Sequence, residues 1–545
     1  MRGPGVVFTA IAVAATLTLG VVALDASQSS PPAVAEFAPA ALNQVKNAPN
    51  QLGAQGAPSS SPTPTPTPSS RGHTPSPSAT PSIDQAAVFA CVGNPPRQIQ
   101  DPQSPPCVRY WKGDNGGATS FGVTRDEIRI AVPHGQGFET PRDDENAIAD
   151  FFNTHFEFYG RKIRLEQFYV TGDTFAEPKP TDMIADARYV HSPLKAFASL
   201  QYLDRKGAEM PFYDELSRLK IVSVQGGGML STEAHLRAHA PYEWSFGTAT
   251  DVMFANIGQF TCAQLAGNPA KYGGPYNWSA GTPTRTFGVL STITPDGSEA
   301  DVSPLVNALR ACNVKPTVIH ANQAQQASDA VNPIVQLSQA HVSTVMCICD
   351  GGSLRNFLTA AEAQGYDPEW EVSSYLGDAF DNTPNQTPPD QAQHLIGLSF
   401  NNKYLPNAQM PWYTAMRQGD PNASIPTGTT GYQVDNFYEA LLLVASGIQQ
   451  AGPHLTPATF QAGLQRAVFP DPGVGAPPYY QSGIGYSSGS HAMKTDAGMV
   501  WFDNTQPGTE NPQSTGAICW VRHGERHGLD GWRREQPAFG TGTCL

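Results

Sequence analysis

The sequence contains little charge, and positive charge is the scarcer kind. Of its 545 residues 15% are charged, with 33 Lys and Arg against 47 Asp and Glu, so that the formal net charge is −14. Proteins that hold nucleic acids need clustered Lys and Arg to neutralise phosphates, and this sequence has no basic stripe. We therefore expect no nucleic-acid partner, and we read the acidity mainly as a contribution to solubility.

Familiar catalytic motifs are missing as well. The sequence has no G-x-S-x-G, H-E-x-x-H, Walker loop or dinucleotide fingerprint, and no C-x-x-C pair that would suggest a structural zinc site. His523 and His527 have the i, i+4 spacing of zinc-binding helices, but a glycine follows each of them in a ribbon-like stretch. We predict no enzymatic activity, no cofactor and no metal site.

The N-terminus lacks a cysteine that could carry a lipid anchor. Val6–Leu24 is an apolar run that follows Arg2. The run is long for the core of a signal peptide and just long enough to cross a bilayer. Residues 1–25 are therefore either a cleaved signal or an uncleaved anchor. In both cases the rest of the chain lies outside the cytoplasm, secreted or anchored by this segment.

Proline and glycine are abundant, with 49 and 51 residues, and part of this excess lies in one segment. Residues 26–83 consist largely of Ala, Pro, Ser, Thr, Gln and Asn, and Ser61–Pro68 repeats Pro at every second position. Such a composition cannot bury a core and favours extended polyproline II conformations. We predict a disordered, semi-rigid spacer between a membrane or wall and a globular head.

The eight cysteines are an even number in a chain expected to be exported, which favours disulfides. Proximity predicts Cys91–Cys107, within a lead-in at residues 84–125, and Cys519–Cys544. Cys262 and Cys312 each fall at the end of a predicted helix and could meet. Cys347 and Cys349 then remain on one face of one strand, and the sequence leaves their state open.

Between residues 286 and 378 short apolar strands alternate with amphipathic helices. The strands are expected at 287–291, 317–320, 342–349 and 371–375, and the helical faces at 302–309, 331–337 and 354–361. We expect Pro333 in the first turn of its helix, because a proline deeper in a helix removes a hydrogen bond. This alternation predicts right-handed crossovers onto a parallel sheet.

The same alternation precedes this region. Strands are expected at 128–132, 163–170, 196–200 and 221–224, with helices at 147–158, 183–190 and 212–219, before residues 242–246 cross into a second lobe. Beyond it we expect a strand at 395–400, helices at 432–448 and 460–468, and an antiparallel ribbon of 498–503 with 517–521. The predicted fold is a two-lobed α/β protein whose sheets are mostly parallel and flanked by helices. Lobe I comprises 126–245 and part of 380–500, lobe II comprises 246–379 and part of 395–470, and 495–545 forms the C-terminal ribbon and tail.

Parallel sheets place ligands at the carboxyl ends of their strands. The polar residues expected at these ends are candidates for ligand binding: His134, Gln136, Ser199, Gln201, Tyr202, Gln225, Gly227, Thr292, Asp350, Tyr375 and Asp378.

From about Phe121 to Val521 the sequence resembles the type I solute-binding proteins of branched-chain amino-acid ABC transporters. Three segments, in this order and spacing, carry the resemblance: the polar lead-in and first strand Gly122–Ala131, the helix end Ala360–Pro368, and the "G-x-x-x-F-D" pattern within Thr495–Asp503.

The resemblance implies two lobes that close over a small polar ligand, such as an amino acid or an amide. It places the ligand carboxylate near Ser199, Gln201, Gln225 and Gly227, and the acid that holds its ammonium group at Asp378 or Asp350. The Gln225–Gly228 loop lacks the hydroxyl residue usual in the family, although its glycines still expose N–H groups that could hold an anion.

Two functional hypotheses follow. The first is a monomeric extracytoplasmic solute-binding protein that delivers its ligand to an ABC permease and meets the membrane only through its N-terminal segment. The alternative is a membrane- or wall-tethered sensor or interaction head of the same fold, which is not coupled to transport.

Overall fold

The computed structural model separates the chain into Met1–Ser78 and Ala79–Leu545, and the described residues all lie in the second unit. These residues are 91–135, 142–172, 179–202, 208–226, 231–274, 284–373, 386–424, 426, 429–470, 481–508, 515–540 and 542–544. The predicted signal or anchor and the predicted spacer lie outside them.

The first sheet has five parallel strands in the order β2-β1-β3-β4-β5. They are β1 (Glu127–His134), β2 (Lys162–Tyr169), β3 (Ala198–Ser199), β4 (Val222–Gln225) and β5 (Glu243–Ser245). Residues 242–246, which were expected to cross into the second lobe, also contain a strand that was not predicted: Glu243–Ser245 pairs with Ser223–Gln225 as the edge strand of the first sheet.

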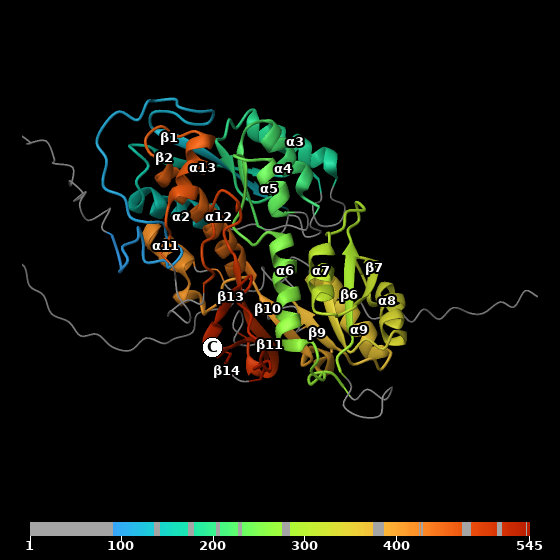
Figure 1. The fold of residues 1–545 in the computed structure, drawn as a ribbon. Helices are drawn as coiled ribbons and strands as arrows, with labels where there is room; N and C mark the ends of the chain where they lie inside the picture. The colour runs from blue at the N-terminus through green and yellow to red at the C-terminus, as the bar shows by residue number, and fades with distance from the viewer. Residues whose placement is uncertain are drawn as a thin grey trace, which may run out of the picture. The chain divides into compact units, whose positions relative to one another are not determined.

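Helices cover both faces of the first sheet (Figure 1). They are α2 (Arg142–His155), α3 (Pro180–His191), α4 (Met210–Arg218), α5 (Glu233–Ala238), α11 (Pro411–Gly419), α12 (Thr429–Ala451) and α13 (Pro457–Arg466). One apolar core joins the sheet to α2, α11, α12 and α13, as with Ile130, Phe152 and Leu441. A second core packs α3 and α4 on the other face. The C-terminal half of the sequence therefore completes the first lobe.

The second sheet is parallel at its centre and antiparallel at one side, in the order β14-β12-β11-β10-β9-β8-β6-β7 with β13 beside β11. Its strands are β6 (Phe287–Ile293), β7 (Thr317–Asn322), β8 (Thr344–Ile348), β9 (Glu369–Val372), β10 (Leu395–Ser399), β11 (Asp496–Pro507), β12 (Thr515–Val521), β13 (Arg526–Gly528) and β14 (Gly542–Thr543). The predicted C-terminal ribbon is confirmed as the antiparallel pair β11 and β12, and it extends this sheet.

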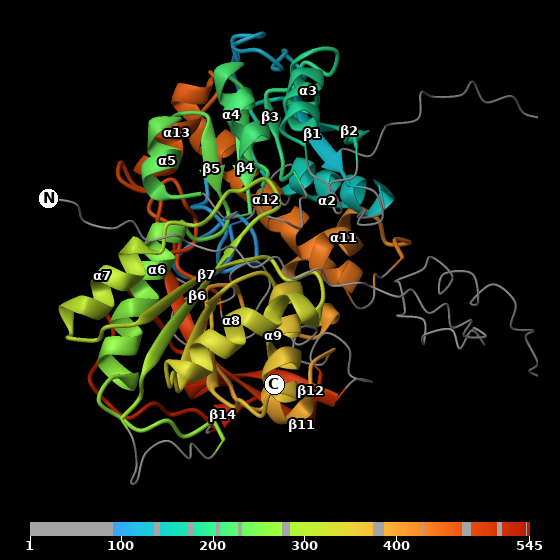
Figure 2. The ribbon, with the colours of Figure 1, turned by 90° about the vertical axis from the view of Figure 1, so that its right-hand side faces the viewer.

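Figure 2 shows the helices on the two faces of the second sheet. They are α6 (Thr250–Phe260), continued by a π-helical turn (Thr261–Leu265), α7 (Ser303–Ala311), α8 (Ala327–Gln339), α9 (Gly351–Ala363) and the short α10 (Pro389–Ala392). The helices α6 and α7 share a core with Val289 and Met346, whereas α8 and α9 pack against Leu290 and Val345. Neighbouring strand residues point to opposite faces, so each strand serves both layers.

The expectation that Pro333 lies in a first helical turn is wrong, because α8 begins at Ala327 and Pro333 lies in its interior. The helix starts early because the Asp329 carboxylate accepts hydrogen bonds from the backbone N–H groups of Gln325 and Gln326, both at 3.1 Å. Burial of Ala330, Ile334 and Leu337 holds the helix together around the missing N–H of Pro333.

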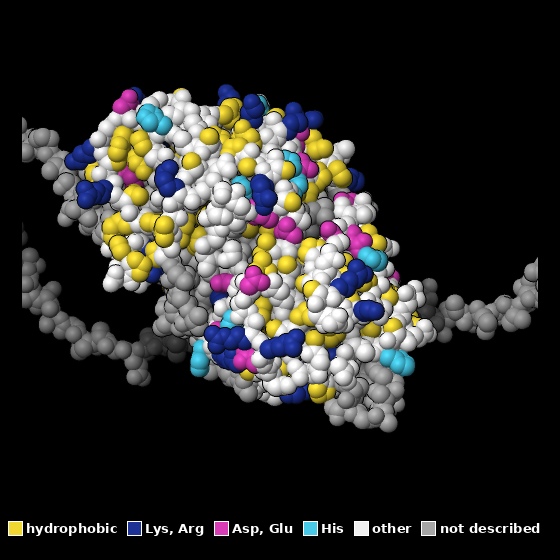
Figure 3. All heavy atoms as spheres, in the orientation of Figure 1, with side chains coloured by type: hydrophobic (Ala, Val, Ile, Leu, Met, Phe, Trp, Pro, Cys, Tyr) yellow, Lys and Arg dark blue, Asp and Glu magenta, His cyan; other side chains and the backbone are white. Residues whose placement is uncertain are grey.

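Four disulfides are present. Cys91–Cys107, Cys262–Cys312 and Cys519–Cys544 confirm the predicted pairs, and Cys347 bonds to Cys349. On the face drawn in Figure 3, Lys and Arg side chains are spread in small groups and form no continuous stripe. Within the described residues, no helix combines the length and the apolar character needed to cross a bilayer.

Candidate functional site

Strands β3 and β4 end side by side, as the sequence predicts. Ser199 is paired with Ser223, and beyond the strands the Gln201 amide lies against Gly226, where a Cβ atom would come within 2.5 Å of its Nε2. The Gln201 side chain is partly exposed, and its amide makes no hydrogen bond to the described part of the chain. Because an amide is both donor and acceptor, Gln201 can bind a polar ligand at this edge.

Other predicted residues of the first sheet have partners within the protein. Tyr202 is buried and donates a hydrogen bond to Asp186 at 3.0 Å. Ser199 donates to the Leu200 carbonyl at 3.2 Å. Gln225 is also buried: its Oε1 accepts from Ser231 and its Nε2 lies 3.5 Å from Glu243 Oε2. These side chains hold the edge of the sheet in place.

His134, at the end of β1, forms a buried pair with Glu145 of α2. His134 Nε2 lies 3.3 Å from Glu145 Oε2, and each side chain is 3% exposed. Burial raises the pKa of Glu145, against the lowering effect of the His134 contact. The pair therefore joins β1 to α2 beneath the surface.

In the second sheet, Thr292 and Asp350 also bond internally. Thr292 is buried and donates to the Ile348 carbonyl at 3.2 Å. Asp350 caps α9, accepting from Gly352 N at 2.9 Å and Ser353 N at 3.0 Å, as suits the start of a helix. The remaining candidates, Gln136, Gly227, Tyr375 and Asp378, lie outside the described residues.

The segment before β11 joins the first sheet where β5 gives way to α6. Met493 N donates to the Ser245 carbonyl at 2.8 Å, and Lys494 N donates to the Gly247 carbonyl at 3.1 Å. The Lys494 ammonium group lies 2.8 Å from Glu439 of α12, with both side chains at most 5% exposed. This ion pair attaches the segment that leads into β11 of the second sheet to α12 of the first lobe.

A buried acidic cluster surrounds this ion pair. Glu439 also accepts a hydrogen bond from Asn402, which follows β10. Burial, then repulsion by Glu439, raises the pKa of Asp435 well above its usual range, and burial raises the pKa of Asp101 to about 6. Sequence reasoning missed this cluster because its members come from four distant segments that share no motif.

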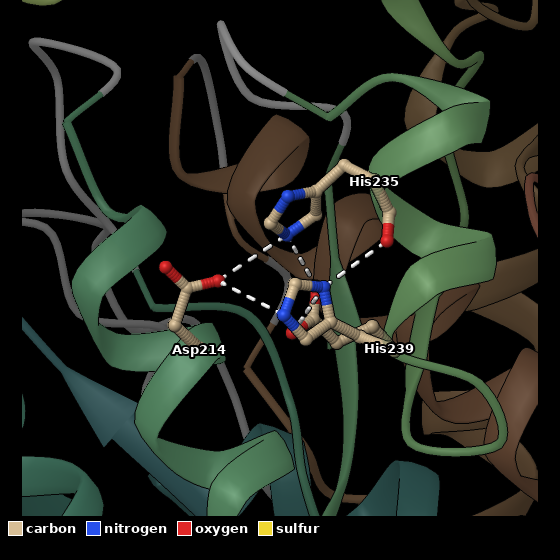
Figure 4. Close-up of side chains that lie close together, drawn as sticks. Asp214, His235 and His239 are labelled. Atoms are coloured by element: carbon tan, nitrogen blue, oxygen red, sulfur yellow. Dashed lines mark hydrogen bonds and ion pairs between the residues drawn. The ribbon is translucent and has the colours of Figure 1, made fainter.

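Four further titratable residues lie close together near the edge strand of the first sheet, and Figure 4 labels three of them, Asp214, His235 and His239. Asp214 belongs to α4, His235 to α5, His239 follows α5, and Glu243 begins β5. Although burial lowers the pKa of His235, its hydrogen bonds to Asp214 and Glu243 outweigh this effect and raise the pKa to about 9. The i, i+4 spacing of the two histidines was the available signal in the sequence.

An open cavity of about 930 Å³ lies at the other edge of the second sheet. Phe287 and Thr317, the first residues of β6 and β7, line it together with Cys262 and Cys312. None of the predicted ligand residues lies in it, and it opens at the amino ends of the strands. The candidate ligand site therefore lies at the carboxyl ends of the strands and not in this cavity.

Comparison with known proteins identifies the fold. Residues 250–500 match the family model described as periplasmic binding protein. No curated protein matches the chain.

Similar solved structures include an ABC transporter substrate-binding protein of Aeropyrum pernix, with 11% identity, a TM-score of 0.52, and coverage of 75% of this chain and 97% of that one. Another, from Sphaerobacter thermophilus, has 13% identity, a TM-score of 0.51, and coverage of 75% and 99%. A branched-chain amino-acid ABC transporter protein of Thermus thermophilus, solved with valine, has 11% identity, a TM-score of 0.49, and coverage of 76% and 97%. The first two structures, whose TM-scores exceed 0.5, establish the two-lobed α/β fold of this chain.

Proposed function

We propose that this protein, whose residues 250–500 match the periplasmic binding protein family model, captures a small polar solute outside the cytoplasm for an ABC-type importer. The family match carries the proposal. The two mostly parallel sheets also support it, because such sheets offer ligand-binding loops at the carboxyl ends of their strands. The protein binds its ligand without chemical conversion, acts as a monomer and requires a permease partner.

The ligand lies at the end of β3 and β4, with Gln201 as its main polar contact in the first lobe. Support comes from the partly exposed Gln201 amide, which has no partner in the described part of the chain, and from its position against Gly226. Ser199 and Gln225 support this edge from within the protein, and Asp350 or Asp378 is the candidate acid from the second lobe. An amino acid or a related amide suits this combination of groups.

Export agrees with the four disulfides, since disulfides persist in oxidising compartments. Residues 1–25 direct the chain outwards, and residues 26–83 separate the binding head from the membrane or wall. The Lys494–Glu439 ion pair lies where the chain passes from the first sheet to the second. Closure of the two lobes would therefore change the backbone near this ion pair.

A thermal-shift screen of the full chain against amino acids, amides, polyols and small peptides tests the proposal. A ligand at a thousand times its dissociation constant should add about 4 kcal/mol to the free energy of unfolding. Gln201→Leu should abolish the shift for the best ligand, while Gln336→Leu, on the exposed surface of α8, should leave it unchanged. If no compound shifts the melting temperature of ligand-free protein, the alternative function is favoured, a tethered sensor or interaction head. The long Pro/Ser/Thr-rich segment supports that alternative.

A further inference from the structure

We propose that Asp214, His235, His239 and Glu243 form a binding site for a first-row transition-metal ion of the zinc class. The site lies on the first lobe, and its four ligand residues are not among the proposed solute contacts. Each residue offers one ligand atom, and the four atoms lie within 4.8 Å of one another. Two imidazoles and two carboxylates are a donor set that suits zinc.

Three of the distances between ligand atoms are close to those around a tetrahedral ion. Zinc lies about 2.0–2.2 Å from nitrogen and oxygen ligands, which places the ligand atoms about 3.4 Å apart. His235 Nε2 lies 3.3 Å from Asp214 Oδ1 and 3.0 Å from Glu243 Oε2, and His239 Nε2 lies 3.8 Å from Asp214 Oδ1. Small side-chain movements therefore suffice to admit the ion.

The orientation of His239 suits a ligand role. Its Nδ1 lies 3.1 Å from the His235 carbonyl, and the tautomer that donates this hydrogen bond leaves a lone pair on Nε2. Metal-binding histidines are commonly oriented by such a bond from the other ring nitrogen. Figure 4 shows both imidazoles and the Asp214 carboxylate turned toward one another.

Glu243 supplies a second, independent observation. Its side chain is fully buried, and its Oε1 faces the cluster without a hydrogen-bond partner, 3.7 Å from His239 Nδ1. A buried carboxylate oxygen without a donor is costly. A bound cation would compensate this oxygen, and the partly exposed Asp214 and histidines leave a path for the ion from solvent.

The backbone around the cluster is held by bonds that do not involve the ligand groups. Thr232 caps α5 by accepting from His235 N at 3.0 Å, and the Asp251 carboxylate accepts from Glu233 N at 2.9 Å. Glu233 in turn accepts from His491 N at 2.9 Å. The two histidines are therefore presented by a segment that is already positioned, which favours metal binding.

The metal would join α4, α5 and β5, three elements that no disulfide connects in the described part of the chain. Glu243 also contacts Gln225 at the end of β4, so an ion here would stiffen the support of the carboxyl edge. A stabilising role is the one that the geometry favours, because all four positions are taken by protein ligands as in closed structural zinc sites.

Titration calorimetry of the full chain, stripped with a chelator, with zinc chloride tests the proposal. We expect about one zinc ion per chain, an increase in melting temperature with zinc, and no response to magnesium or calcium, which prefer oxygen ligands. His235→Gln with His239→Gln should weaken zinc binding by at least about tenfold. The matched control, His454→Gln with His523→Gln, removes two exposed histidines elsewhere. It should change neither the affinity for zinc nor the rise in melting temperature with zinc.

Asp214→Asn provides a milder variant, since Asp214 is half-exposed and its loss leaves the buried Glu243 paired with His235. It should weaken zinc binding while the apo protein keeps its melting temperature within a few degrees. Absence of zinc binding, or equal binding by the cluster and control variants, would overturn the proposal. The solute screen is run in chelator, so its failure and the failure of the metal site remain distinguishable.

Discussion

The two lobes share one construction principle but are held together by different chemistry. Residues 126–245, which supply the first sheet, contain no cysteine, whereas the second lobe and its tail contain six of the eight. The first lobe relies on buried polar pairs such as His134–Glu145 and Glu233–His491. The second adds Cys262–Cys312, Cys347–Cys349 and Cys519–Cys544, and a fully buried Arg285–Glu369 pair.

This difference indicates that metal ions should change the stability of the first lobe, whereas reduction of disulfides should change the stability of the second. A disulfide stabilises by restricting the unfolded chain, whereas an ionic cluster depends on the charge of each member. The predictions below test this contrast in order of expected effect.

Arg285→Leu should have the largest effect, a loss of about 3–5 kcal/mol in the free energy of unfolding. Arg285 is fully buried, and it donates to Glu369 at 2.7 and 3.0 Å, so its removal leaves a buried carboxylate without its ion-pair partner. Urea denaturation measures the loss. Arg310→Leu, on the exposed side of α7, should change stability by less than about 0.5 kcal/mol. Equal effects of the two substitutions would contradict the importance of the buried pair.

Cys262→Ser with Cys312→Ser should cost about 2–4 kcal/mol, because the disulfide closes a loop with a sequence separation of 50. Hydrogen exchange should accelerate in α6 and α7, to which the bond is attached, and remain slow in α2 and α12 of the first lobe. Uniform acceleration of exchange in both lobes would show that the lobes unfold as one unit. It would contradict the expectation that the disulfide stabilises only the second lobe.

Glu371→Gln should flatten the pH dependence of stability in the second lobe. Burial raises the pKa of Glu371 to about 8, while Thr261 donates to it at 2.8 Å. Because the folded state holds this proton more tightly, stability falls as pH rises from about 4.5 through 8, by up to about 1.4 kcal/mol per pH unit. Urea denaturation at several pH values measures the slope. The exposed Glu362→Gln should leave the slope intact, and an unchanged slope in Glu371→Gln would refute the assignment.

Surface ion pairs should have the smallest effects and should not distinguish the lobes. Glu535→Gln removes the partner of Arg522 in the second lobe, and Glu127→Gln removes a partner of Arg164 in the first. Each should cost less than about 1 kcal/mol at pH 7, because solvent screens exposed pairs. The hydrogen bond from Arg522 lowers the pKa of Glu535, so its contribution is present above the unfolded pKa and is lost as the pH falls. Larger losses, or losses that persist in 1 M salt, would contradict this expectation.

Sequence patterns predicted most strands because apolar runs such as Phe287–Ser291 and Leu395–Phe400 are buried on both faces. They failed at Glu243–Ser245, where a short strand begins with a buried carboxylate, and at Pro333, where packing overrides a local preference. The candidate site was less predictable. A position at a strand end brings Gln201 and Tyr202 to the same edge, but only the folded structure shows that the Tyr202 hydroxyl turns inward to donate to Asp186.

Composition and periodicity by themselves indicated the two-lobed α/β class, the acidic character and the pairs Cys91–Cys107 and Cys519–Cys544, because these depend on local pattern and proximity along the chain. Only the tertiary structure decided that α11, α12 and α13 complete the first lobe and that Cys347 bonds to Cys349. It alone brought Asp214 of α4 to the histidines of α5 and to Glu243 of β5. Contacts between distant segments depend on the packing of helices against a sheet, which no local stretch of sequence encodes.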